Sequence, residues 1–300
     1  MMRWKLMLVA AWAILIPMVA SADPIPDPII QIIREAAKTG NPATLQMTAN
    51  LAKTTNPRSI AEIDALVAGL KQDAETARVA KLTSQGFFEG WSGEGEVGAS
   101  VTTGTTKNRT LALGVNLKKD GLNWRHKLVG IVNYARNDDT TTADRYLASY
   151  QGDYKFSSRL FVYGLFQWEQ DRFAGFDRRY TESAGAGYTI LDTPEFNWQI
   201  SGGPALRQTR SITRQLESDT TVHAGTTFLW NISPATIFTE DLGAYIAGND
   251  DTYFSTTALT TKIMDHLSAR GSFNITSEGN PPSGIDSTNT ITRLTLVYSF

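Results

Sequence analysis

The last twelve residues of this 300-residue chain alternate in polarity along almost their whole length. Leu294, Leu296, Tyr298 and Phe300 occupy every second position, and the positions between them are polar apart from Val297. Successive side chains of a β-strand point to opposite faces, so the alternation predicts a strand whose two faces meet unlike media.

The same period of two runs from about residue 93 to the C-terminus, divided into segments by turn-forming residues. Each segment has close to the roughly 9–11 residues that a tilted strand needs to cross a bilayer. Short and long connections mostly alternate, as they do in up-and-down barrels. We therefore predict an all-β fold, a 12-stranded antiparallel up-and-down transmembrane β-barrel preceded by a small α-helical segment. The strands are expected at about 93–103, 107–118, 123–136, 144–156, 159–170, 179–190, 196–207, 219–230, 235–247, 252–263, 267–277 and 288–300.

Aromatic residues gather near the two ends of these predicted strands. Trp124, Tyr154 and Trp198 are expected near the periplasmic end, and Trp168 and Tyr180 near the outer end. Two aromatic belts are typical of a surface that crosses a membrane. A soluble barrel or sandwich would assign the same faces in reverse, with the aromatic residues inside. The two aromatic belts, the even number of strands, the N-terminal export signal and the terminal Phe300 favour the membrane barrel.

The N-terminus has the three parts of a secretory signal. Arg3 and Lys5 precede an apolar run from Leu6 to Ala20, and Ala20-Ser-Ala22 is a small-residue cleavage site. The run is too short for a spanning helix, and no later segment approaches the roughly 20 consecutive apolar residues that such a helix needs. We predict a signal peptide over residues 1–22.

Residues 23–85 have a helical pattern instead of a period of two. Asp27-Pro28 is a good helix start, Asn41-Pro42 begins a second helix, and Ser59 with Glu62 forms a capping box for a third. The sequence predicts a small helical periplasmic segment before a barrel at 86–300. The segment is expected to act as a spacer or packing element, or as a module that binds a periplasmic partner.

The polar faces of the predicted strands carry charges of both signs. In a membrane barrel these side chains point into the lumen, where they line a narrow water path or close on one another as ion pairs. The predicted lumen-lining residues are Arg125, Lys127, Arg145, Asp153, Lys155, Glu169, Arg207, Lys262, Arg270 and Arg293.

Signals for catalysis are weak in this sequence. The chain has no cysteine, so it offers no disulfide and no thiolate metal site. His126, His223 and His266 are expected in different places, and no phosphate-binding glycine-rich loop or metal-ligand spacing occurs. We predict no catalytic residue, no metal and no cofactor. A net charge of −2 does not indicate a nucleic-acid partner.

The stretch from Asp171 to Tyr180 is the most distinctive internal segment and is expected to bridge the fifth and sixth strands at the outer end. Together with residues 122–128, 188–194 and 202–207, this stretch resembles the YdiY-like family. The members of that family are described as salt-induced outer-membrane proteins, and their common region is classed largely as a domain of unknown function. The resemblance covers about residues 86–300 and implies an outer-membrane barrel, without catalytic residues to carry over. The charged residues of the stretch are expected to pair and fix an outer loop, or to face lipopolysaccharide head groups. They are Asp171, Arg172, Asp177, Arg178 and Arg179.

The terminal Tyr298 and Phe300 resemble the closing strand of bacterial outer-membrane barrels. That resemblance implies that they belong to the signal read by the barrel assembly machinery. The combined expectation is a bacterial outer-membrane barrel in contact with lipid and lipopolysaccharide. Its function is expected to be a narrow channel linked to salt or osmotic stress. The alternatives are a non-conducting structural or adaptor barrel whose helices bind a periplasmic partner, a soluble periplasmic binding barrel, and a lipid-modifying barrel enzyme.

Overall fold

The computed structural model describes residues 24–102, 108–138, 140–248, 250–281 and 283–300. The signal peptide predicted at 1–22 lies outside these residues. The chain divides into two compact units, one up to Leu82 and one from Thr83 to Phe300, and each is described by itself.

The first unit contains three helices, α1 (Asp27–Lys38), α2 (Pro42–Thr55) and α3 (Ile60–Ser84). The Asn41 side chain caps α2, because its Oδ1 accepts hydrogen bonds from the backbone N–H groups of Ala43 and Thr44. The predicted start of α1 is shifted by one residue, since Asp27 is already helical and Pro26 occupies the N-cap position. In the described part of the chain, no helix combines the length and apolarity needed to cross a membrane.

A small apolar core holds the three helices together. Ile33 from α1, Leu45 and Ala49 from α2, and Ile63 and Val67 from α3 are buried in one cluster. Such a core forms because apolar residues recur at helical spacing on one face of each helix. Ile33 and Ile63 are completely buried, so this cluster contributes most of the stability that so small a unit has.

Replacing Ile63 with alanine is expected to destabilise the helical unit by about 2–4 kcal/mol, because the change leaves a cavity in its core. Ile60→Ala, on the exposed first turn of α3, is the matched control and is expected to have a much smaller effect. Hydrogen exchange of the amides between residues 27 and 84 in the full chain measures both effects. Equal loss of protection in the two variants would contradict the core described above.

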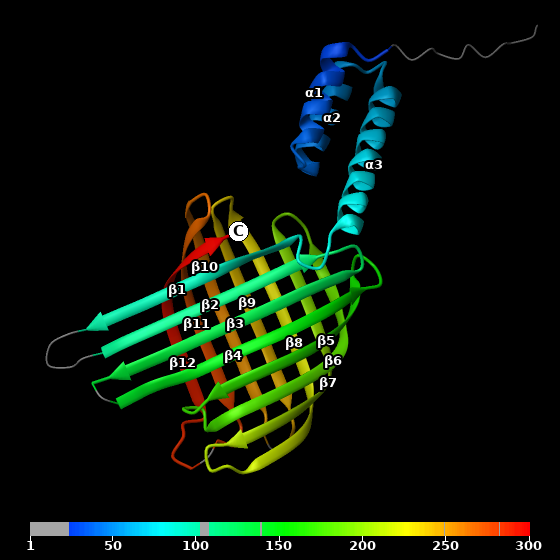
Figure 1. The fold of residues 1–300 in the computed structure, drawn as a ribbon. Coiled ribbons are helices and arrows are strands. Elements are labelled where there is room, and N and C mark those ends of the chain that lie inside the picture. Colours follow the sequence, from blue (N-terminus) through cyan, green and yellow to red (C-terminus); the bar gives the residue numbers. More distant parts are fainter. Residues whose placement is uncertain (1–23, 103–107, 139, 249, 282) are drawn as a thin grey trace, which may run out of the picture. The chain divides into compact units, whose positions relative to one another are not determined.

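Residues from Trp91 onward form twelve antiparallel strands that close into one barrel, which confirms the predicted fold class (Figure 1). Each strand pairs with its neighbours in the sequence, and β1 pairs with β12 to close the ring. The strands are β1 (Trp91–Thr102), β2 (Asn108–Asp120), β3 (Trp124–Asn137), β4 (Thr140–Lys155), β5 (Leu160–Asp171), β6 (Phe176–Asp192), β7 (Phe196–Ser211), β8 (Leu216–Ser233), β9 (Thr236–Ile246), β10 (Thr252–Met264), β11 (Leu267–Glu278) and β12 (Thr288–Ser299).

The two ends of the barrel differ in their connections. Short turns join β2 to β3, β4 to β5, β6 to β7, β8 to β9 and β10 to β11, and we call this side the turn end. The opposite side, the loop end, carries the other connections, including 172–175 and 279–287. Several strands are longer than predicted at the loop end, so residues expected in loops, among them Glu278, belong to strands.

The alternation of the strands separates an outer and an inner face. Leu111, Leu113 and Val115 of β2 are exposed on the outer face, whereas Ala112 between them is buried inside. Val297, the exception in the C-terminal pattern, is completely buried on the inner face opposite Glu96. The inner face is therefore polar along most strands but not at every position.

Candidate functional site

An ion pair crosses the lumen in the half of the barrel near the loop end. Arg179 Nη1 of β6 donates to Glu278 Oε1 of β11 at 2.7 Å, and both side chains are almost fully buried. The two strands lie five places apart in a ring of twelve, so the contact joins nearly opposite walls. Since charge-assisted hydrogen bonds are strongest where water is excluded, this buried pair is a strong contact across the lumen, and we call it and the side chains that hold it the closure.

Neighbouring side chains hold this ion pair in place. Thr252 Oγ1 donates to the second Glu278 oxygen at 2.7 Å, and Arg207 Nη1 donates to Thr252 Oγ1 at 2.8 Å. Arg179 also donates to Thr209 Oγ1 at 3.2 Å. These residues come from four strands, so the closure is a network across the barrel and not an isolated contact.

Aromatic rings support the two guanidinium groups. The Arg179 guanidinium lies 3.9 Å from the centre of the Phe176 ring, and that of Arg207 lies 4.8 Å from the centre of the Tyr245 ring. Both rings are buried. Stacking of this kind stabilises a desolvated arginine and limits its rotamers.

A second charged group lies on the wall formed by β4 and β5. Arg145 Nη2 donates to Glu169 Oε1 at 2.9 Å, and its Nε lies 3.9 Å from Asp171 Oδ2. The other Asp171 oxygen accepts the backbone N–H groups of Phe173 and Ala174, at 3.1 and 3.0 Å. Asp171 thus ends β5, shapes the following loop and contributes charge to the lumen.

The half near the turn end has its own ion pairs. Arg125 Nε donates to Asp153 Oδ2 at 2.6 Å, and Lys127 lies 3.7 Å from the same oxygen. Asp153 is completely buried, and Gln151 donates to its other oxygen at 2.7 Å. Arg125 also donates to Gln199 of β7 at 3.3 Å, which joins strands four places apart.

Some polar side chains in this half of the lumen remain exposed. Asn116, Thr227 and Asp241 occupy inward-facing positions on β2, β8 and β9, and their side chains are exposed. Arg270 of β11 crosses above β12 to Glu94 and Glu96 of β1, at 2.8 and 3.3 Å. The turn-end half of the lumen therefore carries polar and charged side chains, some of which are accessible to solvent.

The ten predicted lumen residues fall into three groups. Seven are inward-facing and lie in the ion pairs described above or, for Arg207, in the hydrogen bonds that hold them. Lys155 and Lys262 lie at the rim of the turn end, where Lys155 Nζ donates to the Gly121 carbonyl and Lys262 lies 3.8 Å from Asp265. Arg293 faces inward from β12, and in the described part of the chain no acidic group pairs with it.

The five charged residues of the predicted outer-loop motif separate in the structure. Arg172 of the β5–β6 loop and Asp177 at the start of β6 form an exposed pair at 3.2 Å, and Arg178 is exposed nearby. Asp171 and Arg179 are buried instead on the inner face. The sequence interpretation did not single out the partner of Arg179, Glu278, because the eleventh strand was expected to end at residue 277. Glu278 shares the inward phase of Arg270, which is the signal that would have found it.

The loop between β9 and β10 is fixed by one of its own aspartates. Asp251 Oδ1 accepts the backbone N–H groups of Ala247 and Gly248, at 2.9 and 3.0 Å, and these bonds lower the pKa of Asp251. Burial raises the pKa of the neighbouring Asp250, and the positive charge of Arg179 opposes that shift. This loop thus brings a further carboxylate near the closure.

The three histidines occupy separate places. His126 stacks on Trp124 on the outer face, with ring centres 6.1 Å apart, and hydrogen bonds to the Tyr150 hydroxyl. His223 faces inward and lies 2.9 Å from the Tyr163 hydroxyl. His266 lies in a turn, beside the Ser299 carbonyl. This separation offers no basis for a shared histidine site.

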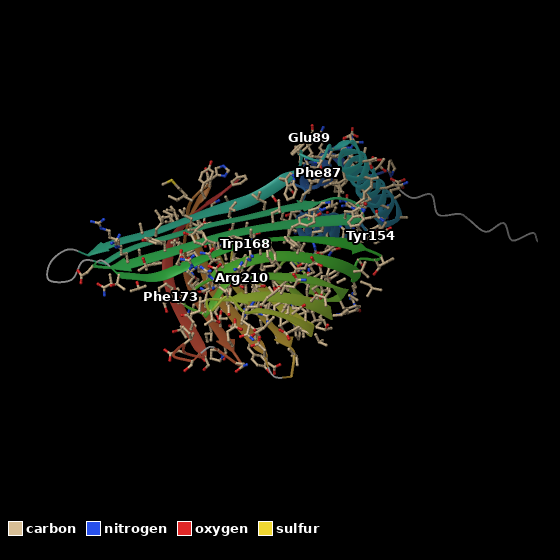
Figure 2. All side chains as sticks on the ribbon, turned by 60° about the horizontal axis from the view of Figure 1, so that its bottom comes forward. Phe87, Glu89, Tyr154, Trp168, Phe173 and Arg210 are labelled. Atoms are coloured by element: carbon tan, nitrogen blue, oxygen red, sulfur yellow. The ribbon has the colours of Figure 1, made fainter. Side chains whose placement is uncertain are left out.

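The outer face is apolar and carries aromatic residues at both ends. Figure 2 shows the side chains of Phe87 and Tyr154 near the turn end, and those of Trp168 and Phe173 toward the loop end. Exposed leucine, valine and isoleucine side chains lie between the two ends on most strands. So extensive an apolar surface marks a region that contacts lipid or another protein.

Comparisons with known proteins agree with the sequence resemblance. The uncharacterized protein YdiY of Escherichia coli (strain K12) is 24% identical over 210 residues, which cover 70% of this chain and 83% of that protein. Among solved structures, the NanC porin gives a TM-score of 0.43 at 11% identity, covering 69% of this chain and 98% of its own. The COG4313 outer membrane channel from Pseudomonas putida F1 gives 0.44 at 11% identity, covering 70% and 95%. The family model described as "Protein of unknown function, DUF481" matches residues 95–300, which is more than half of the chain, and the chain therefore belongs to this family.

Proposed function

We propose that this protein is an outer-membrane barrel that forms a narrow channel, closed near its loop end in the state described here. The observation that carries the proposal is the contrast between the two halves of the lumen. One half keeps exposed polar side chains, and the other is crossed by the buried pair of Arg179 and Glu278. A lumen that is hydrated from one side and closed by a few side chains suits gated passage better than a solid core.

The proposed location is the bacterial outer membrane, after export directed by residues 1–22, with the helical unit in the periplasm. The apolar outer face supports contact with lipid, and the charged loop end suits contact with lipopolysaccharide. Tyr298 and Phe300 are exposed on the outer face, where the barrel assembly machinery is proposed to read them. The proposal assigns no catalytic residue and no cofactor.

A link to salt or osmotic stress is the finer part of the proposal, and the resemblance to a family described as salt-induced supports it. The lumen offers a physical route to such a link, because its charged groups attract or repel ions according to ionic strength. Growth of a deletion strain at raised salt, with and without the restored gene, tests this part separately.

The main test is the conductance of the purified, refolded protein in a planar bilayer, with heat-modifiable gel mobility as proof that the barrel is closed. We expect small, infrequent conductance steps, and we expect Arg270→Glu to shift ion selectivity toward cations. A closed barrel that gives no steps under any voltage or salt condition would overturn the channel.

A non-conducting adaptor is the second candidate, and a specific observation on the helical unit favours it. Met47 and Leu51 lie one turn apart on α2 and are 72% and 66% exposed. Ile32 on α1 is exposed as well. Apolar side chains left open at this spacing suit a partner helix or groove.

Met47→Ser with Leu51→Ser separates the two functions. The adaptor requires loss of the stress phenotype while conductance stays unchanged. The channel requires that the stress phenotype and the conductance both stay unchanged, since neither residue belongs to the barrel.

A further inference from the structure

We propose that Arg293, Arg145 and Asn133 form a binding site for a phosphate-type oxyanion on the inner wall of the barrel. The three residues come from β12, β4 and β3 and lie in the half near the loop end. The site rests on the barrel fold and not on conduction, so it stands whether or not the lumen passes ions.

Arg293 supplies a positive charge that no group of the described chain neutralises. Its side chain is half-buried, and no described residue forms an ion pair or hydrogen bond with it. Arg145 is the cation whose charge acts on it, and the two guanidinium groups repel each other. An arginine that lacks a counter-ion in a half-buried place is stabilised when an anion binds to it.

The acidic groups nearby already have partners. Glu169 accepts from Arg145, and Glu96 accepts from Arg270. Asp171 lies 3.9 Å from Arg145 and also accepts two backbone N–H groups. Arg293 is therefore a cation of this wall without a partner among the described residues, and Arg145, which binds Glu169 through Nε and Nη2, keeps its Nη1 for a ligand.

Asn133 is the second, independent observation. Its side chain is 7% exposed, and neither its Nδ2 nor its Oδ1 has a hydrogen-bond partner. An unsatisfied buried amide destabilises the folded state, and native structures contain few of them. Asn133 lies directly opposite Arg145 in the β3–β4 register, with both side chains inward, so a ligand oxygen held by Arg145 is in place to accept the amide N–H.

The side chains between Asn133 and β12 are minimal. Asn133 pairs with Ala112 of β2, and Ala112 pairs with Gly98 of β1, along one row of the inner face. A Cβ atom at Gly98 would lie 2.9 Å from Thr295 Cγ2, so the row continues from β1 to Thr295 of β12. Arg293 is the next inward-facing residue of β12 after Thr295, and the row between Thr295 and Asn133 holds only Gly98 and Ala112.

The seam between β1 and β12 gives the site a second route of access. The two strands share four residue pairs, from Glu94–Ser299 to Val97–Leu296, whereas β1 and β2 share twelve. Beyond Val97 the described part of β1 has no ladder partner in β12, and Figure 1 shows the two strands diverging toward the loop end. The oxyanion can therefore be a free anion from the lumen water or the head group of a lipid at the seam.

Calorimetric titration of the refolded full-length protein in a non-ionic detergent tests the site with two probes, inorganic phosphate and dihexanoyl phosphatidic acid. Arg293→Gln is expected to weaken binding of the better probe by at least about 10-fold, and Asn133→Leu by about 3- to 10-fold. Arg159→Gln, which removes an exposed arginine from the β4–β5 turn, is the control and leaves binding unchanged. Without a probe, Asn133→Leu is expected to keep or raise the unfolding temperature, because it removes an unsatisfied amide.

The outcomes separate the two sources and the two proposals. Phosphatidic acid binding at least ten times more tightly than phosphate would identify a lipid head group, and equal affinities would identify a free anion. If the protein fails to conduct but binds either probe through Arg293, the oxyanion site is supported and the channel proposal is contradicted. Absence of binding to the unaltered protein, or binding that survives both Arg293→Gln and Asn133→Leu, would overturn the site.

Discussion

Glu278→Gln is expected to raise the open probability of the barrel in a planar bilayer by about 10-fold or more. The change keeps the shape of the side chain but removes the charge that holds Arg179 across the lumen. A buried arginine without its carboxylate is costly, so the Arg179 side chain is expected to turn toward the hydrated half of the lumen. Single-channel recording measures the effect as longer and more frequent openings.

A matched control and a charge exchange make this prediction specific. Arg172→Gln breaks the exposed pair between the β5–β6 loop and Asp177 of β6 and is expected to leave conductance unchanged, since surface pairs contribute little. Exchanging the charges, as Arg179→Glu with Glu278→Arg, is expected to restore the closed state in part. Unchanged conductance in Glu278→Gln would mean that the lumen is closed elsewhere.

The fold was predictable because its signal is local and repeated. A period of two, interrupted by turn residues, occurs in segment after segment, and neighbouring segments pair with each other in the barrel. The predicted strands are therefore correct even where their ends are wrong by a few residues. Val297 shows the limit of the pattern, because an apolar residue at an inward position looks like an error until its complete burial beside Glu96 is known.

The closure was not predictable, because its contacts depend on the dimensions of the whole barrel. Arg179 and Glu278 lie 99 residues apart, and only the strand number and register bring them together. Arg179 belonged to a motif that was expected to fix an outer loop, and Glu278 was assigned to a loop. Boundary errors of one to three residues thus leave the fold correct and still conceal its charged contacts.

The close contact between β6 and β7 likewise could not be predicted from the sequence. Their regular pairing is interrupted between Ser183–Ala205 and Ala186–Gly202, where Pro204 has no N–H to donate. Ser183 Oγ donates to the Pro204 carbonyl at 3.1 Å in this gap. The two backbones approach unusually closely there, and glycine on both strands makes the approach possible.

Gly203→Ala is therefore expected to disrupt the barrel more than an ordinary substitution in a strand. A Cβ atom at Gly203 would overlap the Ala184 carbonyl oxygen and crowd the Gly185 Cα, and one at Gly185 would overlap the Gly202 carbonyl oxygen. These are backbone atoms, so the strain is relieved only if the two strands separate and lose hydrogen bonds. We expect a loss of about 3 kcal/mol or more in the free energy of unfolding.

Gly164→Ala on β5 is the matched control, because a Cβ atom there meets nothing within 4 Å. Both substitutions lower the conformational entropy of the unfolded chain equally, so the difference between them isolates the contact between β6 and β7. Urea unfolding in detergent, followed by heat-modifiable gel mobility, gives that difference directly. Equal stability of the two variants would show that the strands can separate without loss, and that the short distance between them does not hold this side of the barrel together.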